Sequence, residues 1–315
     1  MDLKQMKKTV AMAFCMLLLF VLVFSILIMS IDNEVDSHRD SVFIIWGTLD
    51  YADETYMGGE PERDASRDIC DSIHRFVSDT QQYVYCKNFW GDDTQPNQVY
   101  GNVSYCEENY NFTAIFYKGH SIGASCDMEG CEFGEHWTIY AAEGYKHEYI
   151  LDYLIHDSLS SVIHDFVFLW TCGYGAEDMI GEIDNNGHSI GMMASWMNTT
   201  DLEADGYATP DGSQRCFIGF DIYSIFFITK TGYGDFDYGD FASLFFEYAM
   251  IDGWSVNDAL DAAAEETHLQ SSFGDCQLYT GYLMPDPHGP GDYVTCYMRV
   301  WGDGNLKLGE GGMGK

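Results

Sequence analysis

Two stretches decide the fold: Phe112-Thr-Ala-Ile-Phe-Tyr-Lys-Gly-His120 and Phe166-Val-Phe-Leu-Trp-Thr-Cys172. Each contains a continuous apolar run of strand length, and each ends at a residue that can do chemistry. Unbroken apolar strands are typical of parallel sheets whose two faces are both covered. We therefore expect both stretches to be interior strands of an α/β sheet.

Extended and helical patterns alternate around these two strands. The apolar runs predict further strands over 42–46, 83–86, 137–140, 216–220 and 293–301. Helical periodicity predicts helices from Pro61 onward and over 96–109, 151–162, 239–251 and 256–267. Such alternation predicts a three-layer α/β sandwich with a mostly parallel sheet between helices. Functional residues then gather beyond the carboxyl ends of the strands.

The N-terminus predicts a transmembrane helix. Lys4, Lys7 and Lys8 precede an uncharged run from Thr9 to Ile31, and acidic residues follow it. About 20 apolar residues cross a bilayer. The positive-inside rule then leaves the N-terminus in the cytoplasm and the rest of the chain outside the cell. A cleaved signal peptide is the open alternative, although its apolar core is usually about 7–15 residues long. Both readings export the domain.

These patterns divide the chain into four parts. We expect a cytoplasmic stub and membrane anchor over 1–31, a polar linker over 32–40, a folded domain over 41–308 and a flexible tail over 309–315. The net charge of -35 excludes a general nucleic-acid surface, because phosphate binding needs clustered Lys and Arg.

The cysteines predict disulfides in an exported domain. Cys15 lies in the apolar run, and nine cysteines follow it: Cys70, Cys86, Cys106, Cys126, Cys131, Cys172, Cys216, Cys276 and Cys296. Oxidising compartments favour bridges, so the odd number predicts four bridges and one thiol left over. A local bridge between Cys126 and Cys131 is plausible, and the remaining pairing stays open. Glycosylation sequons at Asn102, Asn111 and Asn198 are compatible with export.

His120 and Cys172 are the candidate catalytic pair. If their strands are neighbours in a parallel sheet, both side chains emerge at the same edge. A thiol attacks only as the thiolate, and an adjacent imidazole can take its proton. The glycines beside them would let a substrate backbone approach closely, and the leftover thiol suits Cys172. The plain alternatives are a core cysteine and a hydrogen-bonded histidine at a strand end.

An apolar strand ending in Gly-His, followed about fifty residues later by an apolar strand ending in Cys, resembles the caspase/gingipain/legumain group of cysteine peptidases. The gingipain branch is the more similar. Its final strand runs into Gly-Asp-Pro and a further aliphatic stretch, as Met298-Arg-Val-Trp-Gly-Asp303-Gly-Asn-Leu-Lys-Leu308 nearly does. Its preceding helix, glycine and small-residue helix are similar to 245–263. The resemblance covers 41–308 and implies a caspase-like fold.

The resemblance also implies roles for individual residues. His120 would be the general base and acid, and Cys172 would attack a peptide carbonyl and form a thioester. The backbone N–H groups of Cys172 and near Ser121 would hold the oxyanion. The family usually has glycine where Ser121 stands, so a side chain there would narrow the cleft or move the donor.

The expected function is a membrane-anchored, extracytoplasmic cysteine endopeptidase with a peptide or protein substrate. The acidic domain would favour cationic peptides, with Lys or Arg at the cleaved position. A catalytically silent cell-surface binding or adhesion domain is the alternative, with the aromatic-rich loop 173–215 as its recognition surface. A weaker one is a relative that transfers acyl groups to amines.

No cofactor is expected from these motifs. The acidic stretches around 184–187 and 235–240 are calcium candidates, because Ca²⁺ prefers oxygen ligands. Neither stretch fits the EF-hand pattern. The residues concerned are Asp184, Asp235, Asp237 and Asp240.

Overall fold

The chain forms two compact units, Met1–Asp40 and Ser41–Lys315. A computed structural model describes residues of the second unit: 41–48, 59–125, 135–140, 149–158, 165–172, 182–183, 189–197, 214–230, 237–286, 289 and 291–310. The expected anchor and linker lie outside these residues, as does most of the expected tail. Within the described part, no helix is long and apolar enough to cross a bilayer.

The second unit is built on a six-stranded sheet with the order β13-β10-β7-β3-β1-β2. Its strands are β1 (Ser41–Gly47), β2 (Tyr85–Trp90), β3 (Phe112–Lys118), β7 (Phe166–Trp170), β10 (Cys216–Phe220) and β13 (Met298–Gly302). All neighbours pair in parallel except β10 and β13, which are antiparallel. The expected α/β class with a mostly parallel sheet is therefore confirmed.

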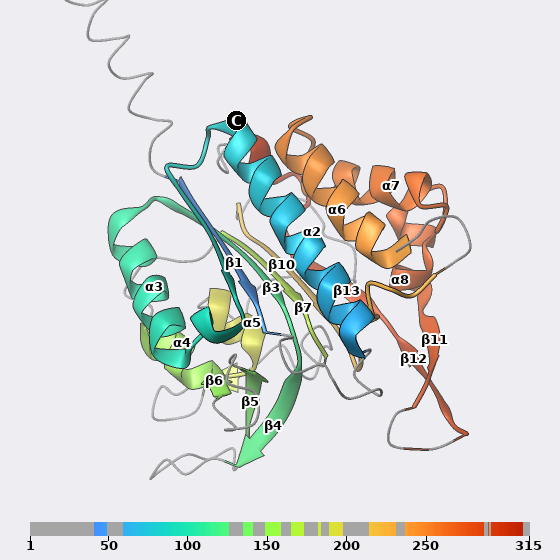
Figure 1. The fold of residues 1–315 in the computed structure, drawn as a ribbon, viewed down its shortest axis with the longest axis horizontal. Helices are drawn as coiled ribbons and strands as arrows, with labels where there is room; N and C mark the ends of the chain where they lie inside the picture. Colours follow the sequence, from blue (N-terminus) through green and yellow to red (C-terminus); the bar gives the residue numbers. More distant parts are fainter. Residues whose placement is uncertain are drawn as a thin grey trace, which may run out of the picture. The chain divides into compact units, whose positions relative to one another are not determined.

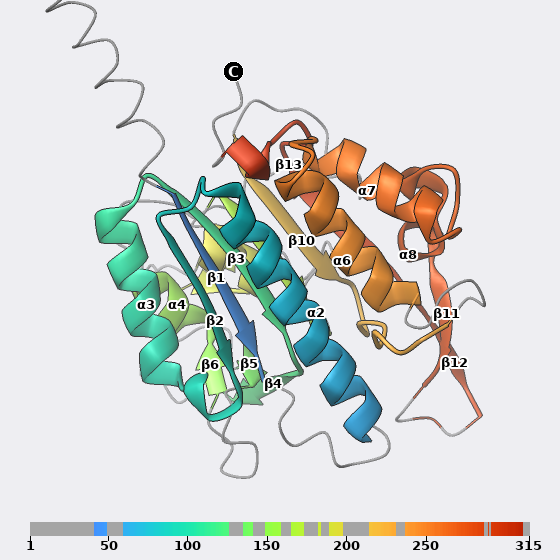
Figure 2. The ribbon, with the colours of Figure 1, turned by 45° about the horizontal axis from the view of Figure 1, so that its top comes forward.

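Helices cover both faces of this sheet, as Figure 1 and Figure 2 show. Phe43 and Ile45 of β1 pack in one cluster with α2 (Gly59–Thr80), α6 (Asp237–Met250) and α7 (Val256–Glu266). Val42, Ile44 and Trp46 pack on the other face with α3 (Pro96–Asn109), α4 (Asp152–Ser158) and α5 (Met192–Met197). Because successive side chains of a strand point to opposite faces, one apolar strand serves both cores.

Local signals explain the helices that hold this core. Ile69, Ile73 and Val77 of α2 are buried, as their spacing predicted. Ser255 caps α7, because its Oγ accepts the Asp258 N–H at 3.2 Å. Gly253 separates α6 from α7 at φ +68, a left-handed conformation that glycine adopts without strain.

The C-terminal strand expected over 293–301 is in fact two strands. β12 (Tyr293–Cys296) pairs with β11 (Tyr282–Pro285) in a separate hairpin, whereas β13 closes the main sheet against β10. The sequence shows an extended pattern throughout, and such a pattern does not reveal where the pairing partner changes. The strand expected over 83–86 is β2, which runs from Tyr85 to Trp90. Tyr83, just before it, is buried and donates its hydroxyl to the Leu308 carbonyl at 2.7 Å.

The strand expected over 137–140 lies outside the main sheet. It is β5 (Glu135–Tyr140), which pairs with β4 (Ser121–Ser125) and β6 (Tyr149–Leu151). The remaining short elements are β8 (Glu182–Ile183), β9 (Ser189–Ile190), α8 (Gln277–Thr280) and three 3-10 turns, η2 (Gly91–Asp93), η4 (Phe273–Asp275) and η5 (Leu308–Glu310).

The structure supports no disulfide among the cysteines of the described part of the chain, so the expected four bridges stay a prediction. Seven cysteines carry no disulfide bond: Cys70, Cys86, Cys106, Cys172, Cys216, Cys276 and Cys296. Four bridges among nine cysteines would leave only one thiol. All seven except Cys86 and Cys172 are buried, where a thiol packs as a small apolar side chain. Cys126 and Cys131 lie outside the described residues. The cysteine count therefore does not single out Cys172.

Candidate functional site

The strands that lead to His120 and Cys172 lie side by side. β3 and β7 are parallel neighbours, with Lys118 opposite Trp170 in the register. His120 and Cys172 each follow this register pair by two residues, beyond the carboxyl ends of their strands. The Gly119 N–H donates to the Trp170 carbonyl at 3.4 Å, so one backbone hydrogen bond joins the chains just past the strand ends. The expectation that the two strands are parallel neighbours is confirmed.

The Cys172 sulfur is held by Ser224, which sequence reasoning did not single out. The Ser224 N–H donates to Cys172 Sγ at 3.4 Å, and Ser224 Oγ lies 3.8 Å from the same sulfur. Burial raises the pKa of the Cys172 thiol, while the Ser224 bonds and the nearby Lys118 charge counteract that rise. At neutral pH Cys172 is therefore a protonated thiol. The Ser224 N–H and hydroxyl beside its sulfur would stabilise the thiolate once the proton has left.

His120 is kept neutral by its surroundings. Burial and, to a smaller extent, the positive charge of Lys118 lower the pKa of its imidazole to about 4. The His120 carbonyl accepts the Tyr117 hydroxyl at 3.2 Å, and that hydroxyl also shares a 2.8 Å hydrogen bond with Thr48. The imidazole is therefore neutral at neutral pH, and the lowered pKa makes it a weaker base than an exposed histidine.

Gly119 and Ser121 also have structural roles that the sequence did not indicate. A Cβ at Gly119 would collide with Thr48 Oγ1 and the Tyr117 hydroxyl, so the glycine is required by packing inside the protein. The Ser121 hydroxyl donates to the Cys172 carbonyl at 2.7 Å. Its side chain therefore ties the two strand ends together.

A buried ion pair lies beneath these strand ends. Lys118 Nζ is 2.7 Å from Glu62 Oε1, and their side chains are 2% and 0% exposed. Glu62 also accepts the Phe227 and Ile228 N–H groups, at 3.0 and 3.1 Å. Sequence reasoning missed this pair. The sequence did contain a signal for it, because a lysine directly after the apolar run Phe112–Tyr117 needs a carboxylate partner if it is buried.

The calcium candidates lie partly inside and partly outside the described residues. Asp184 and Asp235 lie outside the described part, whereas Asp237 and Asp240 begin α6. Acidic side chains are favourable in a first helical turn, which gives these two a structural role. Among the residues the structure describes, no three or more His, Cys, Asp or Glu side chains gather as a metal site.

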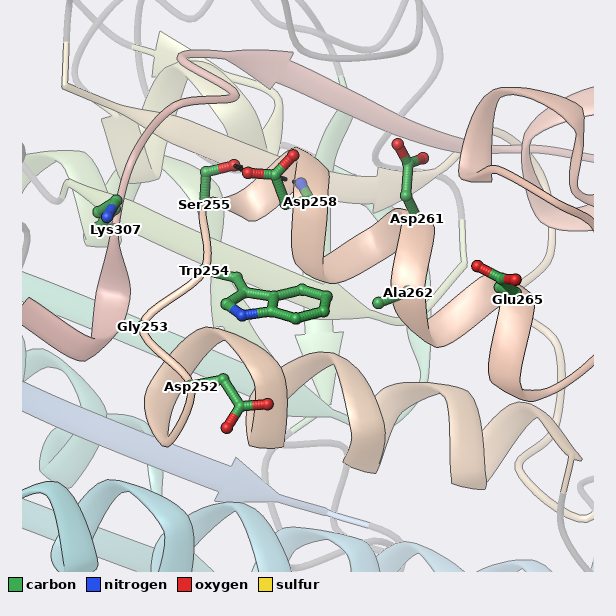
Figure 3. A pocket seen from close by; sticks show the side chains of 9 residues that line it. All are labelled: Asp252, Gly253, Trp254, Ser255, Asp258, Asp261, Ala262, Glu265 and Lys307. Carbon is green, nitrogen blue, oxygen red and sulfur yellow. Dashed lines mark hydrogen bonds between the residues drawn. The ribbon is translucent and has the colours of Figure 1, made fainter.

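A separate hollow lies where α6 meets α7. Its cavity volume is about 560 Å³, and it is lined by Asp252, Gly253, Trp254, Ser255, Asp258, Asp261, Ala262, Glu265 and Lys307. Figure 3 shows the Trp254 ring between Asp252 and Ala262. This ring stacks on Tyr248 with centroids 5.1 Å apart. The hollow belongs to the helix junction and contains neither His120 nor Cys172.

No family model matches the chain, and no curated protein matches it. Among solved structures it is similar to protein GSU0716 from Geobacter sulfurreducens. The identity is 10%, the TM-score is 0.38, and the match covers 83% of this chain and 94% of that chain. A likeness at that score carries no argument about function.

Proposed function

We propose that this chain is a cysteine endopeptidase of the caspase/gingipain-like type, exported and held to the membrane by its N-terminal helix. One observation carries the proposal. The strands that lead to His120 and Cys172 are parallel neighbours, so their ends lie at the same carboxyl edge of the sheet, where such folds bind ligands. The resemblance drawn from the sequence requires the same two residues at the same two strand ends.

The chemistry starts from a neutral pair. Because burial lowers the pKa of His120 and raises that of Cys172, the resting state is an imidazole and a thiol. His120 takes the thiol proton as the sulfur attacks the peptide carbonyl, and a C–S bond forms. The protonated imidazole then gives that proton to the departing amine, leaving a thioester. Water, deprotonated by His120, hydrolyses the thioester and restores the thiol.

Backbone donors would stabilise the oxyanion. The N–H groups of Cys172 and near Ser121 are the proposed pair, because both follow the strand ends directly. The 2.7 Å bond from Ser121 Oγ to the Cys172 carbonyl supports a fixed spacing between these two segments. Removing one such donor typically costs about 10²–10³ in kcat.

Peptide hydrolysis tests the proposal. The full-length protein is assayed against a set of fluorogenic peptides with Lys, Arg or other residues before the reporter bond. We expect cleavage, fastest after a cationic residue, and a loss of about 10³-fold or more in Cys172→Ala and in His120→Ala. Ser255→Ala, at the distant α7 cap, is the matched control and should retain activity. Undiminished cleavage by Cys172→Ala would refute the proposed nucleophile.

A silent binding domain is the second candidate. The raised pKa of the Cys172 thiol favours it, because such a thiol is a poor nucleophile until its proton is removed. On this reading the wild-type protein binds peptides without cleaving them. The same peptide set, followed by binding and by hydrolysis, separates the two functions.

A further inference from the structure

Three elements meet at the buried carboxylate of Glu62. Glu62 lies in the first turn of α2, and its partner Lys118 ends β3 two residues before His120. The Phe227 and Ile228 N–H groups belong to the segment that follows β10. One carboxylate thus binds the strand that leads to His120 and also the segment that reaches Cys172.

The segment 221–230 is fixed at two further points. The Trp170 indole N–H donates to the Ile225 carbonyl at 2.7 Å, and Trp170 lies two residues before Cys172. Lys118 Nζ lies 4.5 Å from the centroid of the Phe227 ring, within cation–π range. Ser224, between these attachments and the sulfur, donates its N–H to Cys172 Sγ.

We propose that the Glu62–Lys118 pair is a positioning unit for Cys172, which holds the 221–230 segment so that Ser224 meets the sulfur. The pair touches neither the sulfur nor a substrate, so its members are positioning residues. The inference rests on the proposed function only in taking Cys172 as the reacting group.

A purely structural ion pair is the competing explanation. Replacing a buried pair by apolar residues is often neutral for stability, so stability alone does not decide the matter. The pKa of Cys172 separates the two explanations, because the positive charge of Lys118 favours the thiolate. The other titratable groups near the sulfur are His120, the proposed base, Tyr223, beside Ser224, and Cys296 of β12. All three stay unchanged in the variants below.

The test is the pH profile of Cys172 alkylation by iodoacetamide in the full-length protein, followed by peptide mapping. The midpoint of the profile reports the charge around the sulfur, and its plateau reports accessibility. Lys118→Met should raise the midpoint by a few tenths to about one pH unit. Lys118→Arg should restore the wild-type midpoint. Ser66→Ala is the control, because it removes only the 3.4 Å contact to Glu62 Oε1 and should change neither quantity.

Two further variants keep the test decisive. If Lys118→Met does not fold, Lys118→Met/Glu62→Gln removes both buried charges and should still raise the midpoint. Ser224→Ala removes the hydroxyl beside the sulfur and should raise the midpoint less than Lys118→Met does. A wild-type midpoint in folded Lys118→Met or in the double variant would overturn the proposal. A change of plateau alone would show a structural role only.

The outcome is separable from that of the peptidase proposal, because alkylation needs no peptide hydrolysis. A raised midpoint in a protein that cleaves no peptide would leave the positioning unit standing and remove the peptidase. Peptide cleavage with unchanged midpoints would do the reverse.

Discussion

His120 should make the folded domain sensitive to acid. Its pKa is lowered from 6.5 to about 4 in the folded protein, first by burial and then by the Lys118 charge. A histidine with a depressed folded pKa contributes stability above its unfolded pKa, and this is lost as pH falls towards the folded value. The sensitive window therefore runs from pH 6.5 down to about pH 4.

The magnitude follows from the width of that window. At about pH 5 the unfolded chain has taken up this proton and the folded chain has not, and each pH unit below 6.5 costs about 1.4 kcal/mol. Acidification from about pH 7.5 to about pH 5 should therefore cost about 2 kcal/mol through His120 alone. Asp165 acts in the opposite direction, because burial raises its pKa to about 7.

Urea unfolding followed by tryptophan fluorescence measures the effect at the two pH values. On acidification, the free energy of unfolding of His120→Asn should fall by about 2 kcal/mol less than that of the wild type. The contribution of Asp165 cancels, because both proteins contain it. Cys172→Ala keeps the histidine and should lose as much as the wild type. If His120→Asn loses as much as the wild type, His120 is not held neutral and the reasoning fails.

Three substitutions test the local structure. Gly119→Ala places a Cβ against Thr48 and should lower the free energy of unfolding by about 1–3 kcal/mol, measured by urea denaturation; an unchanged midpoint would contradict the close approach. Ser121→Gly removes the bond to the Cys172 carbonyl and should lower the free energy of unfolding by about 0.5–1.5 kcal/mol, measured by thermal melts. An unchanged melting temperature would show that this bond does not hold the two strand ends together. Ser255→Ala removes the α7 cap and should cost about 1 kcal/mol, with amide exchange faster in the first turn of α7 than in α6; equal exchange would refute the capping role.

The sequence predicted most of what local patterns control. The apolar runs that end at His120 and Cys172 identified β3 and β7, and helical periodicity over 256–267 identified α7. The break between β12 and β13 was missed, because a change of pairing partner is set by distant strands. Local pattern does not contain that information.

The candidate site was predictable only in part. The strand ends gave His120 and Cys172, since parallel neighbours bring their carboxyl ends to one edge. Glu62 and Ser224 reach the site from other elements, and pairing across such sequence separations depends on the folded chain. The disulfide expectation used compartment and number, whereas most of the described cysteines lie buried in the core without a disulfide.

The most direct test of the central claim is the alkylation rate of Cys172 in the native wild-type protein and in His120→Ala. Cys86 is the internal reference, since it is a partly exposed thiol on β2, away from His120 in sequence. We expect peptide mapping to find Cys172 modified in the wild type and modified more slowly in His120→Ala, with Cys86 unchanged. Equal Cys172 rates in the two proteins, or a native disulfide at Cys172, would contradict the dyad.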